Sequence, residues 1–130
     1  MEGLEEEVFK QDKISDELIC ERILGAVGLA RKAGKCATGT SVCVDYMRAD
    51  KGKLLIISDD ISENTLARLV NTAKYHGIPY INTGIRKAFL AKRLGKTSDT
   101  AAVLLLDEGF VKIIEKLGIE IHTTYTEVLD

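Results

Sequence analysis

Apolar residues follow two patterns along this chain, a helical spacing and short continuous runs, and these predict helices and strands in alternation. Helical spacing of apolar residues, together with capping residues and glycines, predicts helices over residues 15–34, 39–49, 62–77, 83–95 and 107–118. Short apolar runs predict strands over residues 35–38, 53–58, 78–82 and 100–106. Helices and strands are therefore expected to follow one another with short connections.

Particular residues set the predicted ends of these elements. Ser15, Ser62 and Asp107 predict N-caps, because a short polar side chain can accept a hydrogen bond from the first turn of a helix. Thr83 or Gly84 is expected to start the fourth helix.

The alternation predicts an α/β fold, namely a three-layer α/β/α sandwich with a small mixed four-stranded sheet. Pro79 stands near the start of its strand, which predicts that this strand lies at an edge of the sheet. We expect one domain over residues 15–130, preceded by an acidic, mobile extension over residues 1–14. The tail over residues 119–130 is expected to be extended.

The sequence predicts neither a membrane span nor an exported protein. No apolar run approaches the roughly 18 residues that a spanning helix needs. Residues 1–21 are acidic, where a signal peptide would be basic and then apolar. We therefore expect a cytoplasmic protein.

Charge is segregated along the chain. Residues 1–21 carry a net charge of -6, residues 22–98 of +9 and residues 99–130 of -5, within a total of only -2. A basic centre between acidic ends predicts a surface for a polyanion. The same lysines and arginines could instead merely solvate helix faces, and charge alone does not decide between the two readings.

Candidate catalytic and metal-binding groups are sparse. The spacing of Cys20, Cys36 and Cys43 matches neither a CxxC pair nor a zinc finger, so we expect reduced thiols. His76 and His122 have no cysteine or histidine partner at ligand spacing. Because no nucleophile has an adjacent base in the sequence, we expect no enzyme, no cofactor and no metal.

Two carboxylates follow a predicted buried strand. Asp59 and Asp60 could bind a hard cation at the end of that strand. They could instead cap the turn that follows, which is the interpretation we favour.

The stretch GKCATGTS, residues 34–41, comes close to a phosphate-binding loop. A Walker-type loop follows a strand, opens a helix and carries a lysine, whereas here Gly34 ends a helix and Thr40 stands where that lysine would be. What remains is Gly39, Thr40 and Ser41 at a predicted helix N-terminus, where unpaired N–H groups can bind a phosphate or a polar base edge. In the alternative reading, Thr40 or Ser41 merely caps the helix.

Several short motifs in order resemble those of a known family. They are GLARKAGKCATG, the D-x-S-E-N-T pattern at residues 60–65, GIPY, LGK and AAVLLLDEGF, and together they cover about residues 22–117. This order is similar to the ribosomal L7Ae and L30e family of kink-turn RNA binders, and within it to the small bacterial YlxQ-like proteins. The resemblance implies an α/β/α sandwich that binds RNA without a cofactor.

The same resemblance implies where RNA would be bound. The family signature G-x-N-E-x-x-K would begin at Gly39, which places Ser41 at the Asn position, Val42 at the Glu position and Asp45 at the Lys position. The loss of two base-edge contacts predicts weaker recognition of a standard kink-turn. Phosphate contacts supply most general RNA affinity and are expected to remain.

We therefore predict an RNA-binding site and no DNA-binding site. Its residues are Arg31, Lys32, Lys35, Gly39, Thr40, Ser41, Lys87, Lys92, Lys96, Thr97, Ser98 and Thr100. The predicted function is non-enzymatic binding of structured ribosomal or other noncoding RNA. The alternative is a protein-interaction or self-associating module on the same fold, with the acidic N-terminal extension as the segment that meets a protein partner.

Overall fold

Helices and strands follow one another in the predicted alternation across residues 13–123, the part of the chain that this computed structural model describes. The strands are β1 (Cys36–Thr38), β2 (Leu54–Ile57), β3 (Tyr80–Asn82) and β4 (Ala102–Leu105). The helices are α2 (Glu17–Lys32), α3 (Thr40–Arg48), α4 (Glu63–Tyr75), α5 (Lys87–Arg93) and α6 (Glu108–Glu115). The strands are shorter than their apolar runs by one to three residues.

The strands form one mixed sheet in the order β1-β4-β2-β3. β4 runs antiparallel to both of its neighbours, whereas β2 and β3 are parallel. β3 therefore lies at an edge, as the position of Pro79 predicted.

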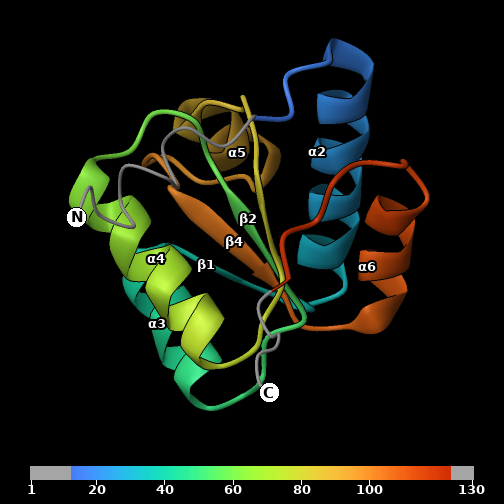
Figure 1. Cartoon of the computed structure of the whole chain (residues 1–130). Helices are drawn as coiled ribbons and strands as arrows, with labels where there is room; N and C mark the ends of the chain where they lie inside the picture. Colours follow the sequence, from blue (N-terminus) through green and yellow to red (C-terminus); the bar gives the residue numbers. More distant parts are fainter. Residues whose placement is uncertain (1–12, 124–130) are drawn as a thin grey trace.

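Helices cover both faces of the sheet (Figure 1). Leu55 and Ile57 of β2 face a core that α3 and α4 complete, whereas Leu54 and Ile56 face a second core formed with α2, α5 and α6. All four side chains are buried, because alternate residues of a central strand point to opposite faces. The three-layer α/β/α prediction is confirmed.

Short polar side chains begin three helices. Ser62 accepts a hydrogen bond from the Thr65 N–H at the start of α4, and Asp107 accepts one from Gly109 at the start of α6, as predicted. The prediction for Ser15 is wrong by one residue, because the carboxylate of Asp16 accepts from the Ile19 N–H and caps α2.

The predicted start of the fourth helix is also wrong. The hydroxyl of buried Thr83 donates to the Ile57 carbonyl at 2.8 Å and accepts from the Ile85 N–H at 3.2 Å. These bonds hold Thr83 against the end of β2, so α5 begins only at Lys87.

Chain segments near both termini pair with β3. Ile14 forms a parallel bridge with Thr83, and His122 forms an antiparallel bridge with Tyr80. Residues 119–123 of the predicted extended tail are described, and residues 124–130 lie outside the described part of the chain. Of the predicted acidic extension, residues 1–12 also lie outside it, while Ile14 pairs beside β3 and Lys13 pairs with Asp59 after β2.

Candidate nucleic-acid interface

Gly39, Thr40 and Ser41 form a turn between β1 and α3, here called the Gly39 turn. Gly39 has φ +95° and ψ 152°, a backbone conformation that residues with a side chain rarely adopt. A Cβ added at Gly39 would meet no atom within 4 Å. Its N–H donates to the Ala102 carbonyl at 3.0 Å, which fixes the turn beside the start of β4. The turn is therefore held by the sheet on one side and open to solvent on the other.

The first turn of α3 has no side-chain cap. The first hydrogen bond within the helix runs from the Cys43 N–H to the Gly39 carbonyl at 2.9 Å. The N–H groups of residues 40–42 therefore have no acceptor within the helix. No acidic residue lies in this turn. The alternative in which Thr40 or Ser41 caps the helix is thus wrong, and the helix end can accept an anion.

Cations from two other segments approach β1. The Lys96 ammonium donates to the Thr38 hydroxyl at 3.2 Å, next to Gly39. Burial raises the pKa of the Cys36 thiol, while the positive charges of Arg31 and Lys96 oppose that rise. Arg31 and Lys96 therefore both act electrostatically on β1.

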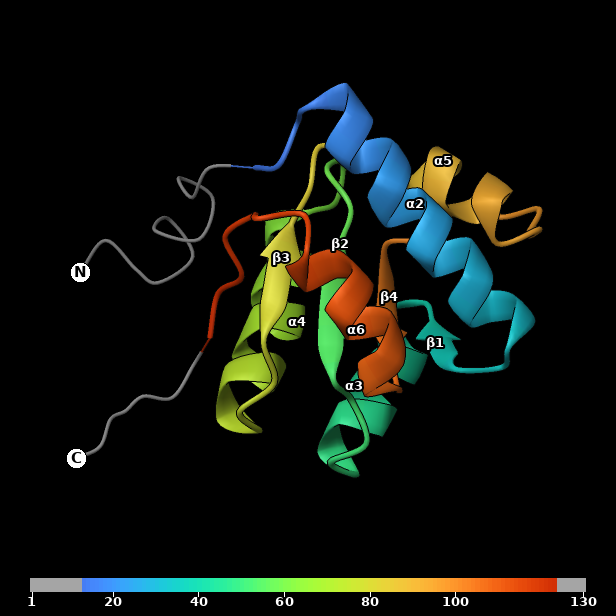
Figure 2. The same cartoon turned by 90° about the vertical axis from the view of Figure 1, so that its right-hand side faces the viewer.

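A groove runs between the end of α2 and the end of α5. Arg31 and Lys32 line it from α2, and Arg93 and Gly95 line it from the other side, around a volume of about 370 Å³. Sequence positions about 60 residues apart thus form one basic surface, here called the basic groove. Figure 2 shows α2 and α5, the helices beside which it lies, next to one another.

The loop before β4 only partly matches its predicted role. Thr97 and Ser98 are exposed, so their hydroxyls can reach a ligand. Thr100 is 1% exposed, and its N–H donates to the Lys87 carbonyl at 3.2 Å. A buried side chain cannot contact RNA at the surface, so the candidate interface excludes Thr100.

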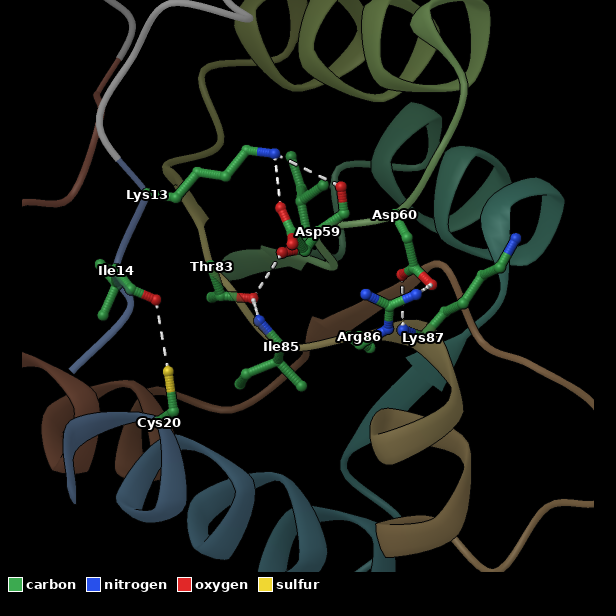
Figure 3. Close-up of polar contacts among 10 residues, drawn as sticks. Lys13, Ile14, Cys20, Asp59, Asp60, Thr83, Ile85, Arg86 and Lys87 are labelled. Carbon is green, nitrogen blue, oxygen red and sulfur yellow. Dashed lines mark hydrogen bonds and ion pairs between the residues drawn. The ribbon is translucent and has the colours of Figure 1, made fainter. Parts of the chain in front are cut away.

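Lys87 is held by Asp60 at the start of α5 (Figure 3). The Asp60 carboxylate accepts from the Lys87 backbone N–H at 2.8 Å, and its second oxygen lies 3.8 Å from the Arg86 guanidinium. Figure 3 shows the Lys87 ammonium extending away from this carboxylate. Asp60 therefore caps α5, and not the turn directly after Asp60 as predicted. The Asp59 carboxylate instead pairs with the Lys13 ammonium at 2.6 Å.

Two predicted cations lie elsewhere. The Lys35 carbonyl accepts from the Leu106 N–H, which places Lys35 at the opposite end of β1 from Gly39. Lys92 lines a separate groove between α2 and α5, together with Glu21 and Phe89. Neither belongs to the surface around the Gly39 turn.

The three altered signature positions are at the surface of α3. Ser41 and Asp45 are exposed, and the Val42 side chain is 45% exposed. Val42 offers no hydrogen-bond acceptor and Asp45 presents a negative charge, so neither can replace the residues of the family signature.

Arg93 was expected from the sequence among the cations on or after the fourth helix, whereas Arg86, beside the predicted cation Lys87, was not. Arg86 precedes Lys87 and shares Asp60 with it, and Arg93 follows Lys92 and pairs with Glu21 at 2.6 Å. The RKAFLAKR run of basic residues at residues 86–93 was the available signal.

Within residues 13–123, no cluster of three histidine, cysteine or acidic side chains is placed to bind a metal. In that same part of the chain, every helix is too short or too polar to cross a bilayer.

The sequence of this chain matches a known protein family. A model of the ribosomal protein L7Ae/L30e/S12e/Gadd45 family matches residues 21–115, which is most of the chain. The chain belongs to this family. The predicted resemblance is confirmed, including its bacterial YlxQ-like branch.

Two bacterial relatives carry the name RNA-binding protein YlxQ. The one from Enterococcus faecium is 27% identical over 97 residues, covering 75% of this chain and 91% of that protein. The one from Bacillus subtilis is 30% identical over 92 residues, covering 70% of this chain and 90% of that protein.

Among solved structures, the Giardia lamblia 15.5kD RNA binding protein superimposes with a TM-score of 0.70. It is 16% identical, and the match covers 81% of this chain and 92% of that one. This likeness confirms the family fold.

Proposed function

We propose that this family member binds structured RNA, ribosomal or otherwise noncoding, in the cytoplasm and without catalysing a reaction. The proposal is carried by the N-terminus of α3, which follows Gly39 and has no side-chain cap. The Lys96 ammonium lies close by, bonded to the Thr38 hydroxyl. Helix N–H groups and a nearby ammonium suit a phosphate, and an exposed Ser41 hydroxyl suits a base edge. The names of the YlxQ relatives support RNA as the ligand class.

The proposed site is smaller than the predicted one. It consists of the Gly39 turn, Lys87 and Lys96, the exposed hydroxyls of Thr97 and Ser98, and the basic groove that carries Arg31 and Lys32. Because Ser41, Val42 and Asp45 replace the signature side chains, we propose binding driven by phosphates, with weak preference for the standard kink-turn.

Salt dependence and one charge reversal test this proposal. Kink-turn, hairpin and duplex RNAs are titrated with the chain at about 50 mM and about 200 mM salt, with duplex DNA as competitor. We expect binding that strengthens as salt falls, and a Lys96→Glu variant that binds about tenfold more weakly with a salt slope reduced by about one. Lys112→Glu is the matched control, because Lys112 is an exposed lysine on α6. This variant should bind RNA as tightly as the parent chain does.

Undetectable binding to every RNA at the lower salt concentration would overturn the proposal, because phosphate contacts are strongest there. Equal losses from Lys96→Glu and Lys112→Glu would also contradict it, since that result indicates a general charge effect.

The alternative function, a protein-interaction module, depends on residues 1–12, which lie outside the described part of the chain. Deleting residues 1–12 retains Lys13 and its bond to Asp59. Loss of a captured protein partner with unchanged RNA affinity would favour the alternative. A rise in RNA affinity would instead indicate that the acidic segment competes with RNA.

A further inference from the structure

A second groove between α2 and α5 lies next to the basic groove and is here called the Phe89 groove. It has a volume of about 450 Å³, and its lining residues are Glu21, Leu24, Phe89, Lys92 and Arg93. Phe89, Lys92 and Arg93 share one face of α5, because residues three and four positions apart are neighbours on a helix. A groove of this volume suits a small ligand or one unit of a polymer.

Phe89 is exposed although the fold does not need it at the surface. Its side chain is 58% exposed, whereas the next residue, Leu90, is fully buried and packs α5 onto the core. An exposed aromatic ring beside cations is the arrangement on which bases of single-stranded nucleic acids stack while the cations meet phosphates. Lys92, exposed on the same face of α5, supplies such a cation.

Arg93 connects the Phe89 groove to the basic groove, because it lines both. A Cβ added at Gly28 would lie 3.3 Å from the Arg93 side chain, so the glycine leaves room for that side chain to cross α2. The Arg93 guanidinium donates to the Glu21 carboxylate at 2.6 Å. Because a guanidinium has several N–H donors, it can hold Glu21 and a phosphate at once. An RNA strand that leaves the basic groove past Arg93 therefore enters the Phe89 groove.

The charges around the Phe89 groove set how a nucleotide can lie in it. Lys92 and Arg93 make one end basic. The space continues past Phe89 toward the start of α2, where Glu17 lines it together with Glu21. Phosphates are attracted to the first end and repelled by the second. The groove therefore suits one nucleotide with its phosphate at the basic end, and not a backbone that runs on past Glu17.

Glu21 gives this groove a means of choosing the base. Its side chain is 63% exposed, and a carboxylate accepts hydrogen bonds from several donors but donates none. The Watson–Crick edge of guanine presents two adjacent N–H donor groups, whereas the other bases present one donor group beside acceptors. A base stacked on Phe89 is best matched by Glu21 when it is guanine.

We propose that the Phe89 groove binds one unpaired guanine nucleotide in the strand that flanks the structured RNA. Phe89 stacks on the base, Glu21 accepts from its Watson–Crick edge, and Lys92 and Arg93 meet its phosphate. The proposal rests on the RNA-binding function proposed above and adds a single-strand subsite with a base preference.

Short RNAs test the stacking role of Phe89. The isotope-labelled chain is titrated with the pentanucleotides UUGUU and UUUUU and followed by NMR at about 50 mM salt. We expect UUGUU to bind about tenfold more tightly than UUUUU, with the largest shift changes at Glu21, Phe89 and Lys92. Phe89→Ala should weaken UUGUU binding about tenfold, and Phe89→Tyr should retain it, because the ring is kept. Tyr75→Ala removes an 86% exposed ring at the end of α4 and is the matched control that should change nothing.

Glu21→Gln tests the base preference. This variant should bind UUGUU and UUUUU within about twofold of each other, without loss of UUUUU affinity, because a negative charge is removed. A pentanucleotide with central inosine, which lacks the guanine amino group, should bind the parent chain with intermediate affinity. A guanine preference that survives Glu21→Gln, or equal losses from Phe89→Ala and Tyr75→Ala, would overturn the proposal.

Blunt-ended duplex RNA separates this proposal from the function on which it rests. The duplex has no unpaired nucleotide, so Phe89→Ala should bind it as the parent chain does, while Lys96→Glu should weaken it. Duplex binding that responds to Lys96→Glu, with no pentanucleotide bound at the Phe89 groove, would refute the subsite alone. Binding of neither RNA would refute both proposals. Shift changes at Glu21 and Phe89 that follow protein concentration without RNA would assign the groove to a second copy of the chain instead.

Discussion

Helices α3 and α4 cover the same face of the sheet, yet their N-termini are built in opposite ways. At α4, the Ser62 hydroxyl accepts from the Thr65 N–H at 3.1 Å, and Glu63 adds a negative charge to the first turn. At α3, Gly39 offers no capping atom, and the first turn contains no acid. One helix end is satisfied within the fold, whereas the other has no side-chain acceptor and suits the anion that we propose there.

The other helices in residues 13–123 resemble α4 in this respect. Asp16 caps α2 and Asp107 caps α6 from the residue before each helix. Arg86 cannot cap α5, but Asp60 reaches its Lys87 N–H from another loop. Among the helices of this described region, α3 alone lacks a side-chain cap. This contrast with the other helices supports the anion-binding role that we propose for the Gly39 turn.

Restoring the family signature on α3 should have the largest effect. We expect the triple variant Ser41→Asn, Val42→Glu, Asp45→Lys to bind a standard kink-turn at least about 100-fold more tightly. It regains two base-edge contacts of about 1–3 kcal/mol each and removes a repulsive charge. A filter-binding titration measures the change, and all three sites lie at the surface, so the fold should tolerate them.

Helix α4 supplies the matched control for that variant. Asn64 and Arg68 already occupy the positions in α4 that Ser41 and Asp45 occupy in α3. Thr65→Glu then completes a similar pattern behind the capped Ser62, and kink-turn affinity should not rise. A comparable gain from Thr65→Glu would show that the side chains matter without an open helix end.

An acid exchange between the two first turns should have the next largest effect. Thr40 and Glu63 are the first residues of their helices. Thr40→Glu should weaken RNA binding about tenfold by adding negative charge where phosphate is expected, and Glu63→Thr should leave it unchanged. Thr40→Glu should also raise the free energy of unfolding by about 0.3–1 kcal/mol through the helix dipole. Loss of RNA affinity together with loss of stability would instead indicate misfolding.

The closed helix ends were the easier ones to predict from sequence. Ser62 and Asp107 act within three residues of themselves, so a local pattern identified both caps. Ser15 and Asp16 are adjacent residues of similar capping strength, and only the geometry chose between them. Asp60 caps a helix 27 residues away, which no local pattern contains.

The site was harder to predict because its members come from separate segments. Lys35 and Gly39 are close in sequence, but an extended strand separates them by about 13 Å at 3.3 Å per residue. Thr100 lies in a polar loop pattern, yet packing buries it. Arg31 and Arg93 meet only because α2 packs on α5. Family resemblance pointed to the turn before α3, and tertiary contacts decide which cations lie around that turn.

Alanine substitutions at the two N-cap positions should each lower the free energy of unfolding. Ser62→Ala should lower the free energy of unfolding by about 1 kcal/mol, because the Thr65 N–H loses its acceptor. Gly39→Ala should cost about 1–2 kcal/mol, because φ +95° strains a residue with a Cβ. Urea unfolding measures both variants. Only Gly39→Ala should weaken RNA binding, and equal RNA losses in the two would argue against a special role for the Gly39 turn.

A pH-dependent effect of similar size concerns Cys43, which closes the first turn of α3. Cys43 donates its N–H to Gly39 as Leu66 does to Ser62, but the Cys43 thiol also approaches the Ala37 carbonyl at 3.5 Å. Burial raises the pKa of Cys43 from 9.0 to about 12.

A raised pKa in the folded state means that the unfolded chain releases this proton first as pH increases. The stabilisation from the protonated Cys43 thiol is therefore complete below pH 9.0 and is lost progressively toward pH 12. Between about pH 8 and pH 10, the difference in unfolding free energy between the parent chain and Cys43→Ala should shrink by about 1 kcal/mol. Urea unfolding of both chains under reducing conditions measures it, and groups that titrate alike in both cancel in the difference. If the difference in unfolding free energy stays constant with pH, α3 does not keep the Cys43 thiol from water. The open N-terminus of α3 would then belong to a helix that is loosely packed along its whole length.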